Sequence, residues 1–162
     1  MFDRCTAAFV ITASLSCACV AAPFNSMGAT LLADRKAVVE AVEKPLTLMQ
    51  FWASWCHSCG GLMDDLQKVT RSHAAMEKIA VSVDVLESDA RKALESKLDR
   101  FDFVFYHDAK QKLADYYSAK SVPTIVLLSP EGVELFRHEG HATSAVLLSL
   151  DQTIAGYRER RK

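Results

Sequence analysis

Two cysteines separated by two residues are the part of this chain best suited to chemistry. Cys56-His57-Ser58-Cys59 follows a short apolar run and precedes a segment with apolar residues at helical spacing. A cysteine at the start of a helix faces free backbone N–H groups and the positive end of the helix dipole, which lower the pKa of its thiol. We therefore expect Cys56 to be the attacking thiolate and Cys59 to resolve the mixed disulfide that Cys56 forms.

Other uses of a cysteine pair fit this sequence less well. A structural zinc site takes four ligands, usually from two such pairs, and the sequence has no second pair. A c-type haem site has histidine directly after the second cysteine, where this chain has Gly60. An inert structural disulfide stays open as an alternative to a redox-active one. We expect no metal and no cofactor.

The first 22 residues have the composition of an export signal. A short start with one basic side chain, Arg4, is followed by an uncharged run over residues 5–22 that ends in Ala21-Ala22. This pattern predicts a secretory signal peptide over 1–22 and a mature domain over 23–162. A retained membrane anchor is the alternative, although the run is barely long enough to span a bilayer. A lipoprotein signal acylated at Cys17 or Cys19 is a third interpretation.

The distribution of the five cysteines sharpens the prediction. Cys5, Cys17 and Cys19 lie in the leader, so a cleaved protein keeps only Cys56 and Cys59. An exported protein with one closely spaced pair favours a redox catalyst in an oxidising compartment, for which we expect the periplasm. The formal net charge of −1 gives no indication of nucleic-acid binding.

The mature chain alternates helical and strand patterns. Helices are expected over 33–43, 57–73, 88–100, 110–118 and 143–157, and strands over 46–53, 79–85, 103–106, 124–128 and 133–138. A turn at Pro130-Glu131-Gly132 joins the last two strands into a hairpin. The length suits one domain, and the order of elements predicts an α/β fold with a mixed central sheet flanked by helices.

Residues 51–59 (FWASWCHSC) and 122–124 (VPT) resemble the two most specific motifs of the thioredoxin superfamily. The resemblance implies a thioredoxin-like fold in which Pro123 is cis and faces the dithiol, with Val122 presenting backbone groups to a substrate disulfide. Trp55 is expected beside the site, where it shields Cys56 and contacts the substrate. A trans proline that merely opens a strand is the alternative at this position.

The segment between Asp84 and Pro123 is long, because it holds an extra helix and an extra strand before the proline loop. This insertion is similar to the TlpA, ResA and DsbE group of exported thioredoxin-like proteins. The resemblance implies reduction of disulfide-containing protein substrates, in many members during cytochrome c maturation. It also implies electrons supplied by a membrane donor of the DsbD or CcdA type.

Four residues bear on the chemistry of the dithiol, and each departs from the thioredoxin pattern or has an open role. Gln50 stands where thioredoxin has a buried Asp that accepts a proton from the resolving thiol, and an amide cannot titrate. By resemblance Glu87 is expected to take that role, with Asp84 second, the alternative being that both are solvated loop carboxylates. His57 is expected to stabilise the Cys56 thiolate, or else to be exposed and weakly coupled.

The sequence thus predicts an exported, monomeric thiol–disulfide oxidoreductase that acts as a protein-disulfide reductase. A disulfide oxidase or isomerase of the DsbA or DsbC kind is the alternative within enzymes. A thioredoxin-fold binding module or metallochaperone is the alternative from another class.

Overall fold

A computed structural model describes residues 28–33, 46–73, 76–95 and 98–161 of the protein. The signal peptide predicted over 1–22 and all but the first residue of the helix predicted over 33–43 lie outside these ranges. Among the helices that the structure describes, none combines the length and the apolar character needed to cross a membrane.

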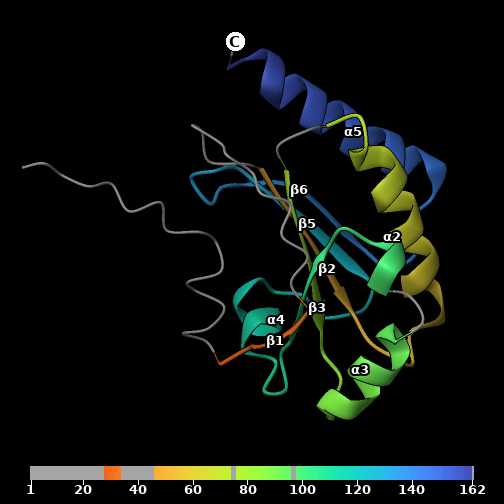
Figure 1. Ribbon diagram of the computed structural model, residues 1–162. Coiled ribbons are helices and arrows are strands. Elements are labelled where there is room, and N and C mark those ends of the chain that lie inside the picture. Colours follow the sequence, from red (N-terminus) through yellow and green to blue (C-terminus); the bar gives the residue numbers. More distant parts are fainter. Residues whose placement is uncertain (1–27, 34–45, 74–75, 96–97, 162) are drawn as a thin grey trace, which may run out of the picture.

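A six-stranded mixed sheet forms the centre of the described fold (Figure 1). Its strands are β1 (Thr30–Ala33), β2 (Leu46–Trp52), β3 (Met76–Ser82), β4 (Val104–His107), β5 (Thr124–Leu128) and β6 (Glu134–Glu139), in the spatial order β1-β4-β3-β2-β5-β6. Strands β4, β3 and β2 are parallel to one another. Strand β1 is antiparallel to β4, β5 is antiparallel to β2, and β6 is antiparallel to β5. The predicted mixed sheet is confirmed.

Helices cover both faces of the sheet, as predicted (Figure 1). Their bounds are α2 (His57–Thr70), α3 (Glu87–Leu94), α4 (Lys112–Tyr116) and α5 (Ser144–Glu159), with a 3₁₀ turn at Leu98–Arg100. One core lies between the sheet and α2, α3 and α5, and a second lies under α4. The predicted thioredoxin-like architecture, including the inserted helix α3 and strand β4 before the proline loop, is confirmed.

Strand β2 is the innermost element, and all seven of its residues are buried. A strand that is covered on both faces reads as a nearly continuous apolar run, as this one does. Leu48 and Trp52 contribute to the core under α2 and α5, whereas Met49 and Phe51 contribute to the core under α4. Phe51 pairs with Thr124 of the antiparallel β5. The end of β2 and the start of β5 therefore meet at one edge of the sheet.

Strand β1 was not predicted, and the start of the helix predicted over 33–43 was wrong. Ala33 was expected to begin a helix, but it ends β1 and pairs with Phe105 of β4. Four residues are too few to show a periodic pattern, so the strand could not be recognised from local sequence. It is defined by its pairing with β4, which is distant in sequence.

Other predicted elements are shorter in the structure. The helix predicted over 88–100 forms as α3 over Glu87–Leu94 and is followed by a 3₁₀ turn at Leu98–Arg100. Strand β3 stops at Ser82 rather than at residue 85, because Asp84 turns to bind the loop before the dithiol. The helix predicted over 110–118 forms only over Lys112–Tyr116. Its start is fixed by Asp108, whose carboxylate accepts hydrogen bonds from the backbone N–H groups of Leu113 and Ala114 at 2.8 and 3.0 Å.

Candidate active site

The two cysteines lie in the first turn of α2 and form a disulfide. Cys56 is the N-cap residue, and its backbone N–H donates to the carbonyl of Ala53 at 3.1 Å. Cys56 is half-buried, whereas Cys59 has only 1 % of its surface exposed. The Ser58 hydroxyl lies 3.8 Å from the Cys56 sulfur. The two cysteines thus differ in exposure, and Cys56 is the more accessible of the two.

A buried carboxylate holds the loop that carries Cys56. Asp84 lies just beyond the end of β3 and is 2 % exposed. Its carboxylate accepts hydrogen bonds from the Ser54 backbone N–H at 2.9 and 3.0 Å and from the Ser54 hydroxyl at 2.7 Å. The Ser82 hydroxyl donates to the same carboxylate at 2.7 Å. Because hydrogen bonds to a charged acceptor are among the strongest in proteins, Asp84 fixes the approach of the chain to the dithiol.

A buried histidine, His107, lies between the backbone of Asp84 and the side chain of Glu87. His107, at the end of β4, is buried, and its Nε2 lies 2.8 Å from the carbonyl oxygen of Asp84. A carbonyl only accepts, so Nε2 carries the hydrogen. Nδ1 of His107 faces Glu87 Oε2 at 3.9 Å, and Glu87 is also paired with Arg91 at 2.6 Å. Glu87 thus contacts His107 and Arg91, and its role as proton acceptor stays a prediction.

The proline loop begins at the same edge of the sheet. The Val122–Pro123 peptide bond is cis, as the resemblance implies. Pro123 is buried, and its carbonyl accepts a hydrogen bond from the Gly140 N–H at 2.7 Å. Val122 is half-buried and packs against both cores. The backbone of this loop is therefore fixed from the β6 side of the sheet.

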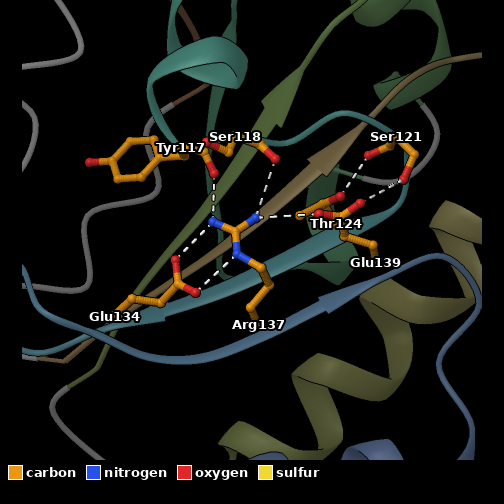
Figure 2. A network of polar contacts seen from close by, with 7 residues as sticks. All are labelled: Tyr117, Ser118, Ser121, Thr124, Glu134, Arg137 and Glu139. Carbon is orange, nitrogen blue, oxygen red and sulfur yellow. Dashed lines mark hydrogen bonds and ion pairs between the residues drawn. The ribbon is translucent and has the colours of Figure 1, made fainter.

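A guanidinium on β6 holds the segment that leads into this loop (Figure 2). Arg137 donates to the carbonyls of Tyr117 at 2.5 Å and Ser118 at 3.5 Å. Glu134 binds the same guanidinium through two hydrogen bonds of 2.9 and 2.8 Å, and these raise the pKa of Arg137. Glu139, also on β6, accepts from the Ser121 hydroxyl at 3.5 Å. Edge strand β6 thus braces residues 117–121 from one side.

Beneath the dithiol, Gln50 takes a defined position. Its side chain is fully buried, and its Nε2 donates to the carbonyl oxygen of Cys59 at 3.0 Å. The amide therefore lies against the resolving cysteine at the position where the sequence comparison with thioredoxin expects a carboxylate.

The remaining predicted site residues are at the surface. Trp55 exposes 64 % of its area, and its expected shielding of Cys56 and contact with the substrate stay predictions. Val85 and Leu86, at the start of the inserted segment, are exposed by 81 % and 57 %. His57 is also exposed, and its effect on the Cys56 thiolate stays a prediction. Within the described ranges, no three His, Cys, Asp or Glu side chains come together as metal ligands.

Comparison with known proteins decides the family. The model of the family described as "Thioredoxin-like" matches residues 44–134, which is more than half of the chain. The chain belongs to the thioredoxin-like family. The match spans β2, the dithiol, the inserted α3 and β4 and the proline loop.

Similar proteins carry redox names. The chain is 30 % identical to the thioredoxin-like protein YneN of Bacillus subtilis over 70 % of this chain and 67 % of that protein. It is 28 % identical to the thiol-disulfide oxidoreductase ResA of Oceanobacillus iheyensis over 52 % of this chain and 44 % of the relative, so it spans less than half of that protein.

Among solved structures, a Chlorobium tepidum protein named as a thiol:disulfide interchange protein DsbE is 26 % identical, with a TM-score of 0.63. That alignment covers 70 % of this chain and 79 % of the other. StoA from Bacillus subtilis, at 21 % identity and a TM-score of 0.55 over 68 % and 83 % of the two chains, supports the fold. The Cys56–Cys59 pair is therefore that of a thiol–disulfide oxidoreductase, as the sequence predicts.

Sequence reasoning did not single out Ser54 or Arg137. Ser54 lies inside the motif, but its role depends on Asp84, thirty residues away. Arg137 sits in an ordinary charged edge strand, and no local pattern links it to the proline loop. A polar residue between Ala53 and Trp55, in an otherwise apolar run, was the one available signal for Ser54.

Replacing Arg137 should separate docking from redox chemistry. In Arg137→Gln the carbonyls of Tyr117 and Ser118 lose their donor, so the loop before Pro123 is held less firmly. We expect the reduced protein to cleave insulin disulfides about tenfold more slowly, because small misplacements of a docking surface are costly. The dithiol–glutathione equilibrium should not change, since Arg137 contacts neither cysteine.

Arg161→Gln is the matched control, because Arg161 pairs with Glu131 and Tyr157 on another part of the surface. It should leave the insulin rate as it is in the unaltered protein. Equal losses of rate in the two variants would contradict a role for Arg137 in holding the loop.

Proposed function

We propose that this protein is an exported disulfide reductase that acts on disulfide-containing proteins through Cys56 and Cys59. The observation that carries the proposal is the difference in exposure within one helical turn. Cys56 is half-buried at the N-terminus of α2, whereas Cys59 is 1 % exposed behind it. Nucleophilic attack on a large partner needs one accessible sulfur, and internal resolution needs a second that the partner does not reach.

In the proposed reaction, two electrons and two protons pass to the disulfide of the partner protein. The reduced protein attacks one sulfur of the partner disulfide with the Cys56 thiolate, which the free N–H groups of the α2 first turn stabilise. The partner's S–S bond breaks, and the leaving thiolate takes a proton. Cys59 loses its proton and attacks the Cys56 sulfur of the mixed disulfide, which releases the second partner thiol. The partner gains two electrons and two protons, and the protein becomes the disulfide form seen in the structure.

In this proposal the substrate docks at the edge of the sheet where the dithiol and the proline loop lie. Val122, before the cis Pro123, is proposed to offer backbone groups to the substrate disulfide, and the exposed Trp55 ring to offer an apolar contact. Glu87, linked to His107, is the proposed proton acceptor, with Asp84 second. Asp84 is 2 % exposed and accepts hydrogen bonds from Ser54 and Ser82, whereas Glu87 is more exposed and is paired with Arg91.

Export and partners belong to the same proposal. The support for export is the sequence of residues 1–22 and the retention of a single cysteine pair after their removal. A periplasmic reductase needs electrons from the cytoplasmic side, so we propose a membrane donor of the DsbD or CcdA type. A role in cytochrome c maturation, and action as a monomer, follow the group that the inserted segment resembles.

Trapping tests the catalytic roles directly. In Cys59→Ala the mixed disulfide on Cys56 has no resolving thiol, so partner proteins should accumulate as covalent complexes that are cleaved by dithiothreitol. Cys56→Ala is the matched control and should trap few or none, because Cys59 is buried. Complexes would be identified by non-reducing gels and mass spectrometry of exported proteins. Equal trapping by the two variants, or trapping by neither, would count against the proposal.

The direction of electron flow is set by the reduction potential. Equilibrium with glutathione should give a value near about −270 mV, as for a reductase. A value near about −120 mV would instead make the protein an oxidase, to which the exposed His57 next to Cys56 would contribute by stabilising the thiolate. That result would leave thiol–disulfide exchange intact and overturn the reductase assignment.

A further inference from the structure

The buried amide of Gln50 has one atom without a partner. Its Nε2 donates to the Cys59 carbonyl at 3.0 Å, and a carbonyl can only accept, so the orientation of the amide is fixed. The other end, Oε1, is buried and has no hydrogen-bond partner. Because Oε1 is bonded to the same carbon as Nε2, it lies close to the backbone of Cys59. An acceptor that is removed from water without a donor is costly, so it calls for an explanation.

Strand β2 carries all the unpartnered buried side-chain atoms found in the described residues. They are Thr47 Oγ1, Gln50 Oε1 and Trp52 Nε1. Alternation along the strand places Gln50 and Trp52 on the face toward α2, where Trp52 and Cys59 share one core, and Thr47 on the opposite face. Of the two atoms toward α2, only Gln50 Oε1 can accept a hydrogen, since an indole nitrogen only donates.

We propose that Gln50 is a positioning residue that stabilises the protonated thiol of Cys59 and thereby favours the reduced form of the site. In the disulfide neither sulfur bears a hydrogen, so Cys59 offers Oε1 nothing. Reduction by a dithiol donor breaks the Cys56–Cys59 bond and delivers two electrons and two protons. In this proposal the Cys59 S–H then donates to the unpartnered Oε1, and the reduced form gains a hydrogen bond that the oxidised form lacks.

Two other acceptors of the site, the Asp84 carboxylate and the Ser58 hydroxyl, already have contacts. The Asp84 carboxylate is held by Ser54 and Ser82. The Ser58 hydroxyl lies against the sulfur of Cys56. The proposal rests on the proposed thiol–disulfide exchange but not on its direction, because either direction passes through the reduced form.

Gln50→Met tests it in the full-length chain. Methionine keeps the length and burial of the side chain but removes the amide. The equilibrium with glutathione should shift about two- to fivefold toward the disulfide, which is the effect of losing one weak hydrogen bond from the reduced form. The infrared S–H stretch of the reduced protein should also move to higher frequency, and the difference spectrum against the unaltered protein isolates the Cys59 band.

Gln67→Met is the matched control, since Gln67 is a partly exposed glutamine on α2 that bonds Arg100 and Asp102 instead. It should change neither measurement. If Gln50→Met does not fold, Gln50→Asn, which withdraws the amide by one methylene, should shift both measurements in the same direction. An unchanged glutathione equilibrium or an unshifted S–H band in a folded variant overturns the proposal. Both measurements stay valid even if no partner is trapped, so a failure of the proposed function would be recognised separately.

Discussion

The register of β2 between its two neighbours is the constraint on which the site depends. Trp52 pairs with Ser82 of the parallel β3, and Phe51 pairs with Thr124 of the antiparallel β5. One edge of the sheet therefore collects the dithiol, the Asp84 turn and the start of the proline loop. A shift of one residue in this register would turn Gln50 away from Cys59 and exchange the two cores. The apolar, doubly covered character of β2 protects the register, because a slip would also move Trp52 out of the core that it shares with Cys59.

The register of β2 brings the dithiol loop and the proline loop together, and hydrogen bonds from residues distant in sequence then hold these two loops. Asp84 holds Ser54 on one side of the dithiol, and Arg137 holds the Tyr117 carbonyl on the side of the proline loop. Neither side chain touches a sulfur. Their effect is to present Cys56 and the proline loop as a preformed surface, so that a partner does not have to order these segments on binding.

Because Cys59 is buried, the two cysteines are suited to different steps of thiol–disulfide exchange. Residues three apart lie on the same side of a helix, so Cys59 lies about one turn further along α2 than Cys56. Cys59 is also the buried one of the two. The deeper sulfur is shielded from foreign thiols, but its thiol or thiolate must be accommodated in an apolar core. The Gln50 amide is a polar group without charge beside Cys59. An Asp at this position would instead add a second titrating group to the core. This explains physically how an untitratable residue fits beneath a redox-active disulfide.

Much of this arrangement could be predicted from local sequence. The strand over 124–128 and the dithiol at the start of a helix follow from apolar runs and motif spacing. Strand β1 could not be predicted, because Thr30–Ala33 is ordered by pairing with β4 rather than by its own pattern. The same holds for Asp84 and Arg137, since a charged residue in a loop or edge strand does not reveal a partner twenty or thirty residues away. Only the folded chain shows that the Gln50 amide has one end occupied and one end free.

Cys56 and Cys59 are unequal because the fold leaves Cys56 half-buried and buries Cys59. Brief alkylation of the fully reduced, folded protein with iodoacetamide, followed by peptide mass spectrometry, measures this directly. We expect Cys56 to be modified at least about tenfold faster than Cys59, because it is the more accessible of the two cysteines. Modification of Cys59 at an equal or greater rate would contradict it.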